Sequence, residues 1–331
     1  MGHTILDVAK KSGYSKATVS RAYTAPESVS KKAKLKIYAA AKSLNYAPSA
    51  IARAMVRQCT ENIAFIIHEK QSPALLNPFY SPILEAVMRE SAHRNYGVYV
   101  MSTRDVQLSE NGIHIKRQMD GVIFAGEADP YIIEKLRGGG TPVVLLNNYL
   151  EMDDLLCITT THYEGAVSAM EHLFERGHRR IALIAGIFSP QVNEARYKGY
   201  IDTLTRHNLE VNPQYILNIQ PTLEAGTKAM LQLLELDLRP TAVFCTNDTI
   251  AAGAMKAIIR TGLCIPKDIA VVGFDDSSVS HIVEPELTTV RIDMDRMGQL
   301  ATEKLFDLMS DGPSGETQIM IPTELIVRSS T

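Results

Sequence analysis

The stretch TILDVAKKSGYSKATVSRAY, residues 4–23, decides how the chain begins to fold. Apolar residues recur in it with helical spacing, and Gly13 interrupts the pattern. Since glycine readily adopts the left-handed backbone that ends a helix, we predict two short helices joined by a tight turn. Thr4 is expected to cap the first helix with a hydroxyl that accepts a backbone N–H bond, and Ser15 to cap the second, which starts at Lys16.

The second predicted helix has one apolar face and one polar face. Val19 and Ala22 face inward at helical spacing, whereas Lys16, Ala17 and Arg21 face outward. A helix pair of this form is typical of a helix-turn-helix, whose second helix enters the major groove of DNA, where Lys or Arg can donate to guanine. An ordinary amphipathic helix pair with a solvated basic face fits the same residues, and the motif alone leaves both interpretations open.

Charge is distributed unevenly along the chain. Residues 1–60 contain eight lysines, three arginines, one aspartate and one glutamate, a formal charge of +9. The whole chain has a formal charge of −3, so residues 61–331 carry about −12. A basic head on an acidic body is expected when one end of a protein meets nucleic-acid phosphates and the other does not.

Length and composition limit the possible protein classes. At 331 residues and 45% hydrophobic composition, the chain is long enough for two or three domains with substantial cores. Its four cysteines lie far apart without metal-ligand spacing, which predicts reduced, mostly buried thiols, no metal and no cofactor. We find no signal peptide and no apolar run of about 18 residues, so we expect a cytoplasmic protein that does not enter a membrane.

The predicted head continues beyond the second helix. Ser30 is expected to cap a third helix, whose inner face includes Ala33 and Ile37 and which ends near Asn45. Pro48 then breaks the chain, and a short helix of small residues follows. A helix of this length is marginal in water, so we expect it to form only against DNA or a second copy of the chain.

The remaining residues alternate between strands and helices. NIAFIIH at 62–68 is a continuous apolar run of the kind found in buried parallel strands, and strand–helix units follow it to about residue 160. The pattern restarts with HRRIALIAG at 178–186. We therefore predict two doubly wound α/β lobes, a tail strand at 317–327 that crosses back between them, and a ligand cleft at the carboxyl ends of the strands.

A series of longer motifs runs through essentially the whole chain. They are T-x-x-D-V-A-x-x-x-G-x-S-x-x-T-V-S-R at 4–21, L-N-Y-x-P-S-x-I-A-R at 44–53, E-R-G-H-R-R-I-A-L-I-A-G at 175–186, R-x-x-G-Y at 196–200, P-T-A-V-F-C-T-N-D at 240–248, I-P-x-D-I-A-V-V-G-F-D-D at 265–276 and P-x-L-T-T-V at 285–290. In these motifs the chain resembles the LacI-type family of bacterial transcriptional regulators, which includes the lac and galactose repressors. The resemblance implies a homodimer on a palindromic operator in double-stranded DNA, with a body that senses a small molecule.

The resemblance also implies a domain organisation. We expect an N-terminal all-α helix-turn-helix head and a two-lobe, periplasmic-binding-protein-like α/β body. The predicted limits are 1–47 for the DNA-binding domain, 48–60 for the hinge helix and linker, 61–331 for the effector-binding and dimerisation domain, about 61–160 and 291–320 for its first lobe, and about 161–290 and 321–331 for its second.

Roles in the head follow from the same resemblance. Lys16, Ala17 and Arg21 match the base-reading positions of the recognition helix, where alanine can pack on a thymine methyl group. The residues expected to position phosphates are Thr4, Ser15, Thr18, Ser20 and Asn45.

Residues 49–56 resemble the family's hinge helix, which inserts a side chain into the minor groove. Met55 lies where the family usually has leucine, and Val56 replaces the usual basic residue. Methionine is long, apolar and flexible, so insertion remains feasible, and packing inside a folded hinge pair is the alternative. The hinge residues expected to contact DNA are Ser49, Ala52, Arg53 and Met55.

In the body, Arg196 and Asp275 match positions that hold the effector in the family. A guanidinium and a carboxylate together suit vicinal hydroxyl groups, which predicts a sugar or a sugar derivative. Two alternatives remain: these two residues can pair with each other across the cleft, and Phe79 can be ordinary packing. The other expected effector contacts are Phe79, Tyr80, Asn147, Asn247, and Gln191 and Asn193 on the loop before Arg196.

The sequence also predicts the roles of several neighbouring residues. Asp248 and Asp276 are expected to cap helices. CITTTH at 157–162 lacks the acidic residue and asparagine often found there, so recognition of hydroxyl groups from that strand is not expected. Pro221 stands where some relatives have a residue that stacks on the ligand.

Two other classes of protein fit the sequence less well. A solute-binding protein of a transport system shares the two-lobe body, but it needs an export signal and no basic head. An enzyme is disfavoured because there is no G-x-G-x-x-G after the first strand, no P-loop and no nucleophile elbow, and because His178 and His281 lack an acid or nucleophile partner in the sequence. The sequence therefore predicts a DNA-binding transcriptional regulator, most simply a repressor under allosteric control.

Overall fold

The computed structural model describes residues 3–46, 59–69, 74–106, 108–109, 112–113, 118–187, 190–312, 315 and 317–331. The chain divides into two units. The small unit runs to Asn62 and also takes in a short later segment that ends at Asp120, and the rest of the chain from Ile63 onward forms the large unit. None of the helices in these ranges combines the length and apolarity needed to cross a bilayer. The domain limits set out above stay a prediction.

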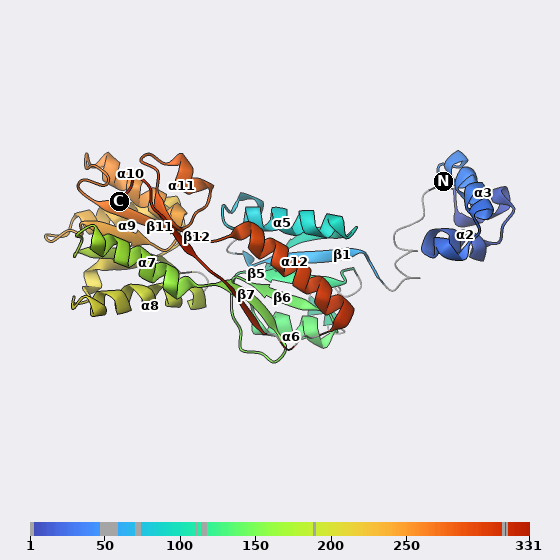
Figure 1. The fold of residues 1–331 in the computed structure, drawn as a ribbon, viewed down its shortest axis with the longest axis horizontal. Coiled ribbons are helices and arrows are strands. Elements are labelled where there is room, and N and C mark those ends of the chain that lie inside the picture. Colours follow the sequence, from blue (N-terminus) through green and yellow to red (C-terminus); the bar gives the residue numbers. More distant parts are fainter. Residues whose placement is uncertain are drawn as a thin grey trace. The chain divides into compact units, whose positions relative to one another are not determined.

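The small unit is a helical head, shown in blue in Figure 1. Its apolar core includes Val8, Val19, Ala22 and Ile37, all fully buried. These residues recur at helical spacing and line the inner faces of elements that are each too short to be stable alone. The elements of the head are α1 (Ile5–Ser12), α2 (Lys16–Thr24), the 3-10 helix Pro26–Ser28 and α3 (Lys31–Ser43).

The ends of these helices follow the sequence signals. Gly13 ends α1 at a φ of 77°, and the hydroxyl of Ser15 accepts from the backbone N–H of Thr18 at 3.1 Å, which confirms both predictions. Thr4 is the N-cap of α1, as predicted, and forms a capping box with Asp7. Its hydroxyl donates to the Asp7 carboxylate at 2.9 Å, and its backbone N–H donates to the same carboxylate at 2.7 Å. The carboxylate is a stronger acceptor than a hydroxyl, and it accepts both hydrogen bonds.

The large unit contains two 6-stranded sheets with the same strand order, and the prediction of two doubly wound lobes is confirmed. The first sheet runs β13-β7-β6-β5-β1-β2 and the second β14-β12-β11-β10-β8-β9. The strands of the first sheet are β1 (Asn62–Ile67), β2 (Gly97–Ser102), β5 (Gly121–Ala125), β6 (Val143–Leu146), β7 (Leu156–Thr160) and β13 (Gln318–Ile321). The strands of the second are β8 (Ile181–Gly186), β9 (Ile216–Ile219), β10 (Ala242–Cys245), β11 (Ala270–Asp275), β12 (Thr288–Arg291) and β14 (Glu324–Ile326).

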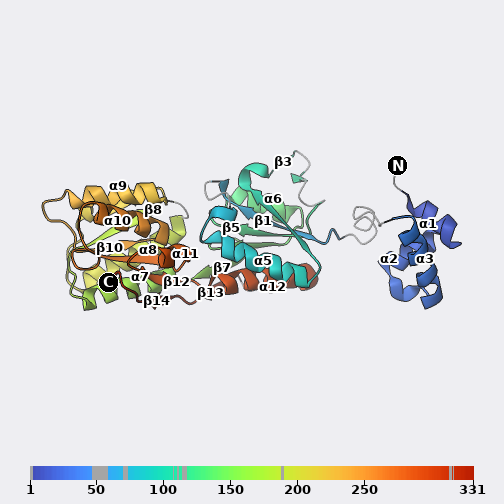
Figure 2. The ribbon, with the colours of Figure 1, turned by 90° about the horizontal axis from the view of Figure 1, so that it is seen from above.

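Helices cover both faces of each sheet (Figures 1 and 2). On the first sheet, α5 (Tyr80–His93) packs against α12 (Met294–Asp311), and α6 (Pro130–Gly138) lies on the opposite face. On the second, α7 (His162–Glu175) pairs with α8 (Pro190–Arg206) on one face, and α9 (Leu223–Leu234) with α10 (Asp248–Arg260) on the other. With both faces covered, central strands such as β5 and β8 are buried along their whole length.

The large unit also contains short elements. Residues Leu108–Ser109 (β3) and Gly112–Ile113 (β4) form an antiparallel pair. Helix α11 (Ser278–Ile282) follows β11 and precedes β12.

The tail strand predicted at 317–327 is two strands in two sheets. β13 pairs in parallel with β7, whereas β14 pairs antiparallel with β12. Thr323, which lies between β13 and β14, donates through its backbone N–H to the hydroxyl of Thr161 at 2.9 Å. Thr161 lies on another segment that passes from the first sheet to the second. The single run in the sequence is therefore divided because each sheet has an edge that the tail can complete.

Candidate functional site

The outer face of α2 presents the predicted base-reading residues. Lys16, Ala17 and Arg21 are all exposed, while Val19 and Ala22 on the opposite face are buried in the head. The hydroxyl of Tyr38 on α3 donates to the carbonyl of Ala22 at 2.6 Å, which fixes α2 against the helix behind it. The arrangement leaves one face of a short, well-anchored helix free, with two cations on it.

Three of the predicted phosphate-positioning residues, Ser15, Thr18 and Ser20, lie at the start of this helix or on it. Ser15 and Thr18 share a hydrogen bond of 2.9 Å between their hydroxyls, and Ser20 is half-buried. Asn45 is exposed just after α3 and has a φ of 48°, a conformation that asparagine tolerates better than most residues. The predicted hinge contacts Ser49, Ala52, Arg53 and Met55 lie outside the described residues.

A buried polar cluster lies at the carboxyl ends of strands in the large unit, and Arg196 is at its centre. This arginine, on α8, is 5% exposed. Its guanidinium lies over the ring of Phe274 at 3.8 Å, donates through Nη1 to the carbonyl of Thr246, and contacts Asp275 Oδ1 through Nη2 at 3.3 Å. Stacking on an aromatic ring and a bond to a fixed carbonyl hold the planar group in one orientation.

His162, at the start of α7, supplies the next contact to this arginine. Its Nδ1 lies 3.3 Å from Arg196 Nη2, and both ring nitrogens lie within 3.3 Å of the Thr160 hydroxyl. Burial, and then the positive charge of Arg196, hold the pKa of His162 well below its ordinary value. A neutral imidazole facing a guanidinium accepts through Nδ1, which assigns the ring proton to Nε2.

Two buried carboxylates complete the cluster. Asp248 accepts from the backbone N–H and hydroxyl of Ser277 at 2.7 and 2.9 Å, and from the Thr289 hydroxyl at 2.6 Å. Burial and the neighbouring Asp275 raise the pKa of Asp248, and burial raises the pKa of Asp275 against the opposing effect of Arg196. Burial also lowers the pKa of Arg196, which stays charged because arginine remains protonated in proteins.

The first sheet contributes a second polar and aromatic group. Asn147 follows β6 with a φ of 54° and is buried, and its Nδ2 donates to the Tyr80 hydroxyl at 3.4 Å. Tyr80 is among the groups that raise the pKa of Arg196, after Asp275 and Asp248. Phe79 meets Tyr80 edge to face at 4.9 Å and belongs to the hydrophobic core, which favours packing as its role.

Two polar atoms of these groups have unused hydrogen-bonding capacity. Among the residues that the structure describes, none pairs with the buried atoms Asn147 Oδ1 and Arg196 Nε. Buried polar atoms are rarely left unpaired, because each costs about 1–3 kcal/mol. Asn147 Oδ1 can therefore accept a further hydrogen bond, and Arg196 Nε can donate one.

Several sequence predictions about this region need correction. Gln191 and Asn193 lie in the first turn of α8, not on a loop before it, and Gln191 is exposed. Arg196 and Asp275 do pair, but both belong to elements of the second sheet and its helices, so they do not bridge the two lobes.

The predicted helix caps were also misplaced. Asn247 caps α10 by accepting from Ile250 N–H at 2.8 Å, so its carbonyl oxygen is already engaged. Asp248 receives the bonds from Ser277 and Thr289 instead. Asp276 binds Arg291 at 2.7 Å and Arg328 at 2.6 Å, and it anchors the C-terminal segment.

The sequence analysis missed His162, Phe274 and the Thr246 carbonyl. The motif at 157–162 lacks the acidic residue and asparagine that would indicate a ligand contact, and it ends in His162. Its place directly after a buried strand was the available signal, because side chains at such positions gather at the carboxyl edge of a parallel sheet.

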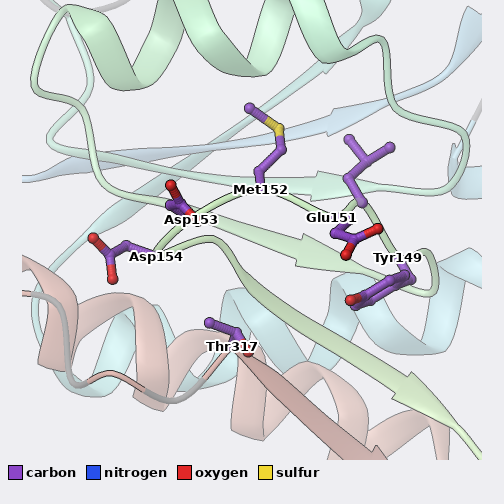
Figure 3. Close-up of a pocket in the computed structure, with 7 residues that line it drawn as sticks. Tyr149, Glu151, Met152, Asp153, Asp154 and Thr317 are labelled. Atoms are coloured by element: carbon purple, nitrogen blue, oxygen red, sulfur yellow. The ribbon is translucent and has the colours of Figure 1, made fainter.

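A separate hollow of about 500 Å³ lies along the loop between β6 and β7 (Figure 3). Its charged residues are Glu151, Asp153 and Asp154, all exposed, and Thr317 closes one side. None of the residues of the buried cluster lines it. The hollow is therefore distinct from the candidate site.

Family models match residues in both units of the chain. The model described as "Bacterial regulatory proteins, lacI family" matches residues 4–49. The model described as "Periplasmic binding protein-like domain" matches residues 170–331.

Relatives and solved structures match over the full length. The HTH-type transcriptional repressor CytR of Escherichia coli is 33% identical, over 99% of this chain and 96% of the relative. The probable HTH-type transcriptional repressor ExuR of Bacillus subtilis is 32% identical, over 99% and 98%. The lac repressor bound to ONPG in its repressed state has a TM-score of 0.84 at 28% identity over 100% of both chains. A CelR–cellobiose complex has a TM-score of 0.74 at 26% identity, over 99% of this chain and 100% of that one.

Proposed function

The chain belongs to the lacI family of bacterial transcriptional repressors, and we propose that it binds a palindromic operator as a homodimer under the control of a small molecule. The observation that carries this proposal is the outer face of α2, where exposed Lys16, Ala17 and Arg21 stand opposite a buried face. A helix held in this way can insert into the major groove and present its cations to guanine.

The other head residues have supporting roles in this proposal. Thr4 at the start of α1, Ser15, Thr18 and Ser20 at or on α2, and Asn45 after α3 bind phosphates, which sets the register of the helix on the duplex. Met55 inserts at the operator centre, with Ser49, Ala52 and Arg53 beside it in the hinge segment.

Control by a small molecule is supported by the buried cluster. Arg196, Asp275 and Asn147 hold a sugar or a sugar derivative through their donors and acceptors, with Tyr80 against it. A similar regulator fits this proposal, since the CelR structure is a complex with cellobiose. The effector changes operator affinity by its differential affinity for two arrangements of the lobes, a coupling of about 1–3 kcal/mol.

Dimerisation is supported by the edge of the first sheet. β2 is the last strand of that sheet, and Tyr99 and Val100 on it are 53% and 43% exposed. Met88 on the adjacent α5 is exposed as well. An edge strand with exposed apolar side chains is a natural interface, and a lac repressor dimer is among the structural neighbours.

Operator binding can be tested with selection and a matched pair of variants. The full-length protein is used to select sequences from a random double-stranded library, and affinity for the selected site is measured by mobility shift. Arg21→Ala is expected to lower affinity about tenfold or more, a loss of about 1–3 kcal/mol. Arg104→Ala, an exposed arginine of the large unit, is the control and should leave affinity unchanged. Equal effects of the two variants would contradict the proposal.

Effector control and dimerisation have separate tests. Operator binding is titrated against candidate sugars, and a protein that binds operator but responds to none of them refutes the effector proposal. Tyr99→Lys should weaken the dimer in sedimentation analysis, whereas Tyr131→Lys, equally exposed at 53% on α6, should not. A monomeric wild-type protein at micromolar concentration would refute dimerisation.

A further inference from the structure

The segment that leads into the first sheet is held by one carboxylate. Asp120 accepts from the backbone N–H of Thr60 at 2.8 Å through Oδ1 and at 3.0 Å through Oδ2, and from the Thr60 hydroxyl at 2.9 Å. It also accepts from the backbone N–H of Glu61 at 2.9 Å and from the Cys59 thiol at 3.0 Å. Three successive residues therefore donate to the same side chain, and both of its oxygens are used.

The backbone of this segment is shaped around the carboxylate. Glu61 has a φ of 57°, in a region that residues other than glycine seldom occupy, and two successive N–H groups are directed at Asp120. Asn62 closes the turn, since its Nδ2 donates to the Thr60 carbonyl at 2.9 Å and its own carbonyl accepts from the Asp120 backbone N–H at 2.8 Å. Hydrogen bonds to a charged acceptor are stronger than neutral ones, so the turn is held in one conformation.

Asp120 itself has little freedom to move. Gly121 follows it as the first residue of β5, which pairs in parallel with β1 and with β6 inside the first sheet. A Cβ at Gly121 would lie 2.9 Å from Leu305 Cδ1 and 3.0 Å from Met309 Sδ, both on α12. The backbone next to the carboxylate is therefore confined between two neighbouring strands and a helix.

The place of this turn in the sequence connects it with the proposed function, on which the inference rests. Residues 48–58, which lie outside the described residues, precede Cys59 directly and include the predicted hinge. A hinge side chain can read the operator centre only if its backbone is delivered to the minor groove from a fixed point. We propose that Asp120 is the positioning residue that fixes where the hinge leaves the body, and that reading of the operator centre depends on it.

Half-site reading does not depend on this carboxylate. Lys16 and Arg21 lie on α2, and α2 is held by the core of the head, in which Val19 and Ala22 are buried. A change at Asp120 should therefore affect one part of operator recognition and spare the other. A residue that only stabilises the fold would affect both parts alike.

Asp120→Asn tests this role with almost no change in shape. The amide keeps one acceptor oxygen and puts a donor NH2 in place of the other, so part of the N–H, hydroxyl and thiol donors lose their partner. Full-length proteins are compared by mobility shift on the operator selected with the wild type, on the same operator with its central base pairs exchanged, and on one with a base pair of each half-site exchanged. The two affinity ratios against the selected operator measure centre discrimination and half-site discrimination.

The expected result is a split between the two ratios. In the wild type each exchange should weaken binding about tenfold or more. In Asp120→Asn, centre discrimination should fall by about threefold or more, whereas half-site discrimination should stay within about twofold of the wild type. Thr60→Val removes one hydroxyl donor and should lower centre discrimination by a smaller factor. Asp129→Asn, which changes an exposed carboxylate that caps α6, is the control and should keep both ratios.

Four results would overturn the proposal. They are an unchanged centre ratio in Asp120→Asn, an equal fall of both ratios in that variant, a wild type that discriminates half-sites but not the centre, and an unchanged centre ratio in Thr60→Val when circular dichroism shows that Asp120→Asn does not fold. All four leave sequence-specific binding by the wild type intact. A wild type that selects no sequence refutes the proposed function, and this inference with it.

Discussion

Replacing Arg196 by methionine should expose how strongly the site depends on a single charge. The guanidinium is 5% exposed, stacks on Phe274 at 3.8 Å and contacts Asp275 at 3.3 Å. Methionine keeps most of the apolar stem, so the principal change is two buried carboxylates without a counter-charge. Removal of one partner of a buried ion pair costs about 3–5 kcal/mol. We expect that loss at pH 7, measured by urea unfolding.

The dependence of this loss on pH has a defined sign. Burial raises the pKa of Asp275 and Asp248 above the unfolded value, and Arg196 opposes that effect at Asp275. A carboxyl whose folded pKa is raised above its unfolded pKa loses stability as pH rises from the unfolded to the folded pKa, and the cost is constant above the folded pKa. In the wild type the pKa of Asp275 is raised to about 7, and it rises further without the arginine. The loss in Arg196→Met should therefore change little between pH 5 and pH 7 and grow above pH 7, by at most about 1.4 kcal/mol per pH unit for this carboxyl.

Two further variants test the same explanation. Arg206→Met, on the same helix, removes an arginine that is 51% exposed and paired with Glu171, so it should cost less than about 1 kcal/mol. The double variant Arg196→Met with Asp275→Asn should be more stable than Arg196→Met alone. A loss below about 1 kcal/mol in Arg196→Met, or no recovery in the double variant, would refute the reasoning.

Three other outcomes are expected. Gly165→Ala places a Cβ 2.8 Å from Phe274 Cζ and should cost about 1–3 kcal/mol in thermal unfolding, whereas Gly138→Ala has open space and should be nearly neutral. Asp276→Asn keeps a residue that tolerates the φ of 53° but removes the carboxylate that lies 2.6 Å from Arg328 and leaves Glu286 at 3.9 Å as the acidic partner, so about 3 kcal/mol should be lost by urea unfolding. Burial raises the pKa of Asp276, but its arginine hydrogen bonds outweigh that and lower it, so this loss should fade below about pH 4, and an equal loss at all pH values would contradict it. Operator affinity should fall steeply with salt, since the head neutralises phosphates, and salt-independent binding would contradict that.

Local signals were sufficient for the head. Gly13, Ser15 and Ser30 act within four residues of their own position, through backbone conformation or a single hydrogen bond to the next turn. The apolar faces of the three helices follow from helical spacing alone. In the same way, continuous apolar runs indicated the buried strands, because a parallel sheet covered on both faces needs no alternation.

The detailed roles of polar side chains were less predictable, because they depend on which partner is nearest in space. Asp248 was expected to cap a helix and instead accepts bonds from Ser277 and Thr289. Thr4 was expected to accept a backbone hydrogen bond, and its hydroxyl also donates to Asp7, which lies within reach. A hydroxyl or carboxylate has several possible partners of similar strength, and only the positions of the other groups decide between them.

The sequence by itself determined the basic head, the alternation of strands and helices, and the family motifs that include Arg196 and Asp275. Only the tertiary structure decided that His162, Phe274 and the Thr246 carbonyl surround that arginine, and that the tail is divided between two sheets. The physical reason is that helices and caps depend on neighbours along the chain. The site depends instead on parallel strands that end at one edge and bring together residues tens of positions apart.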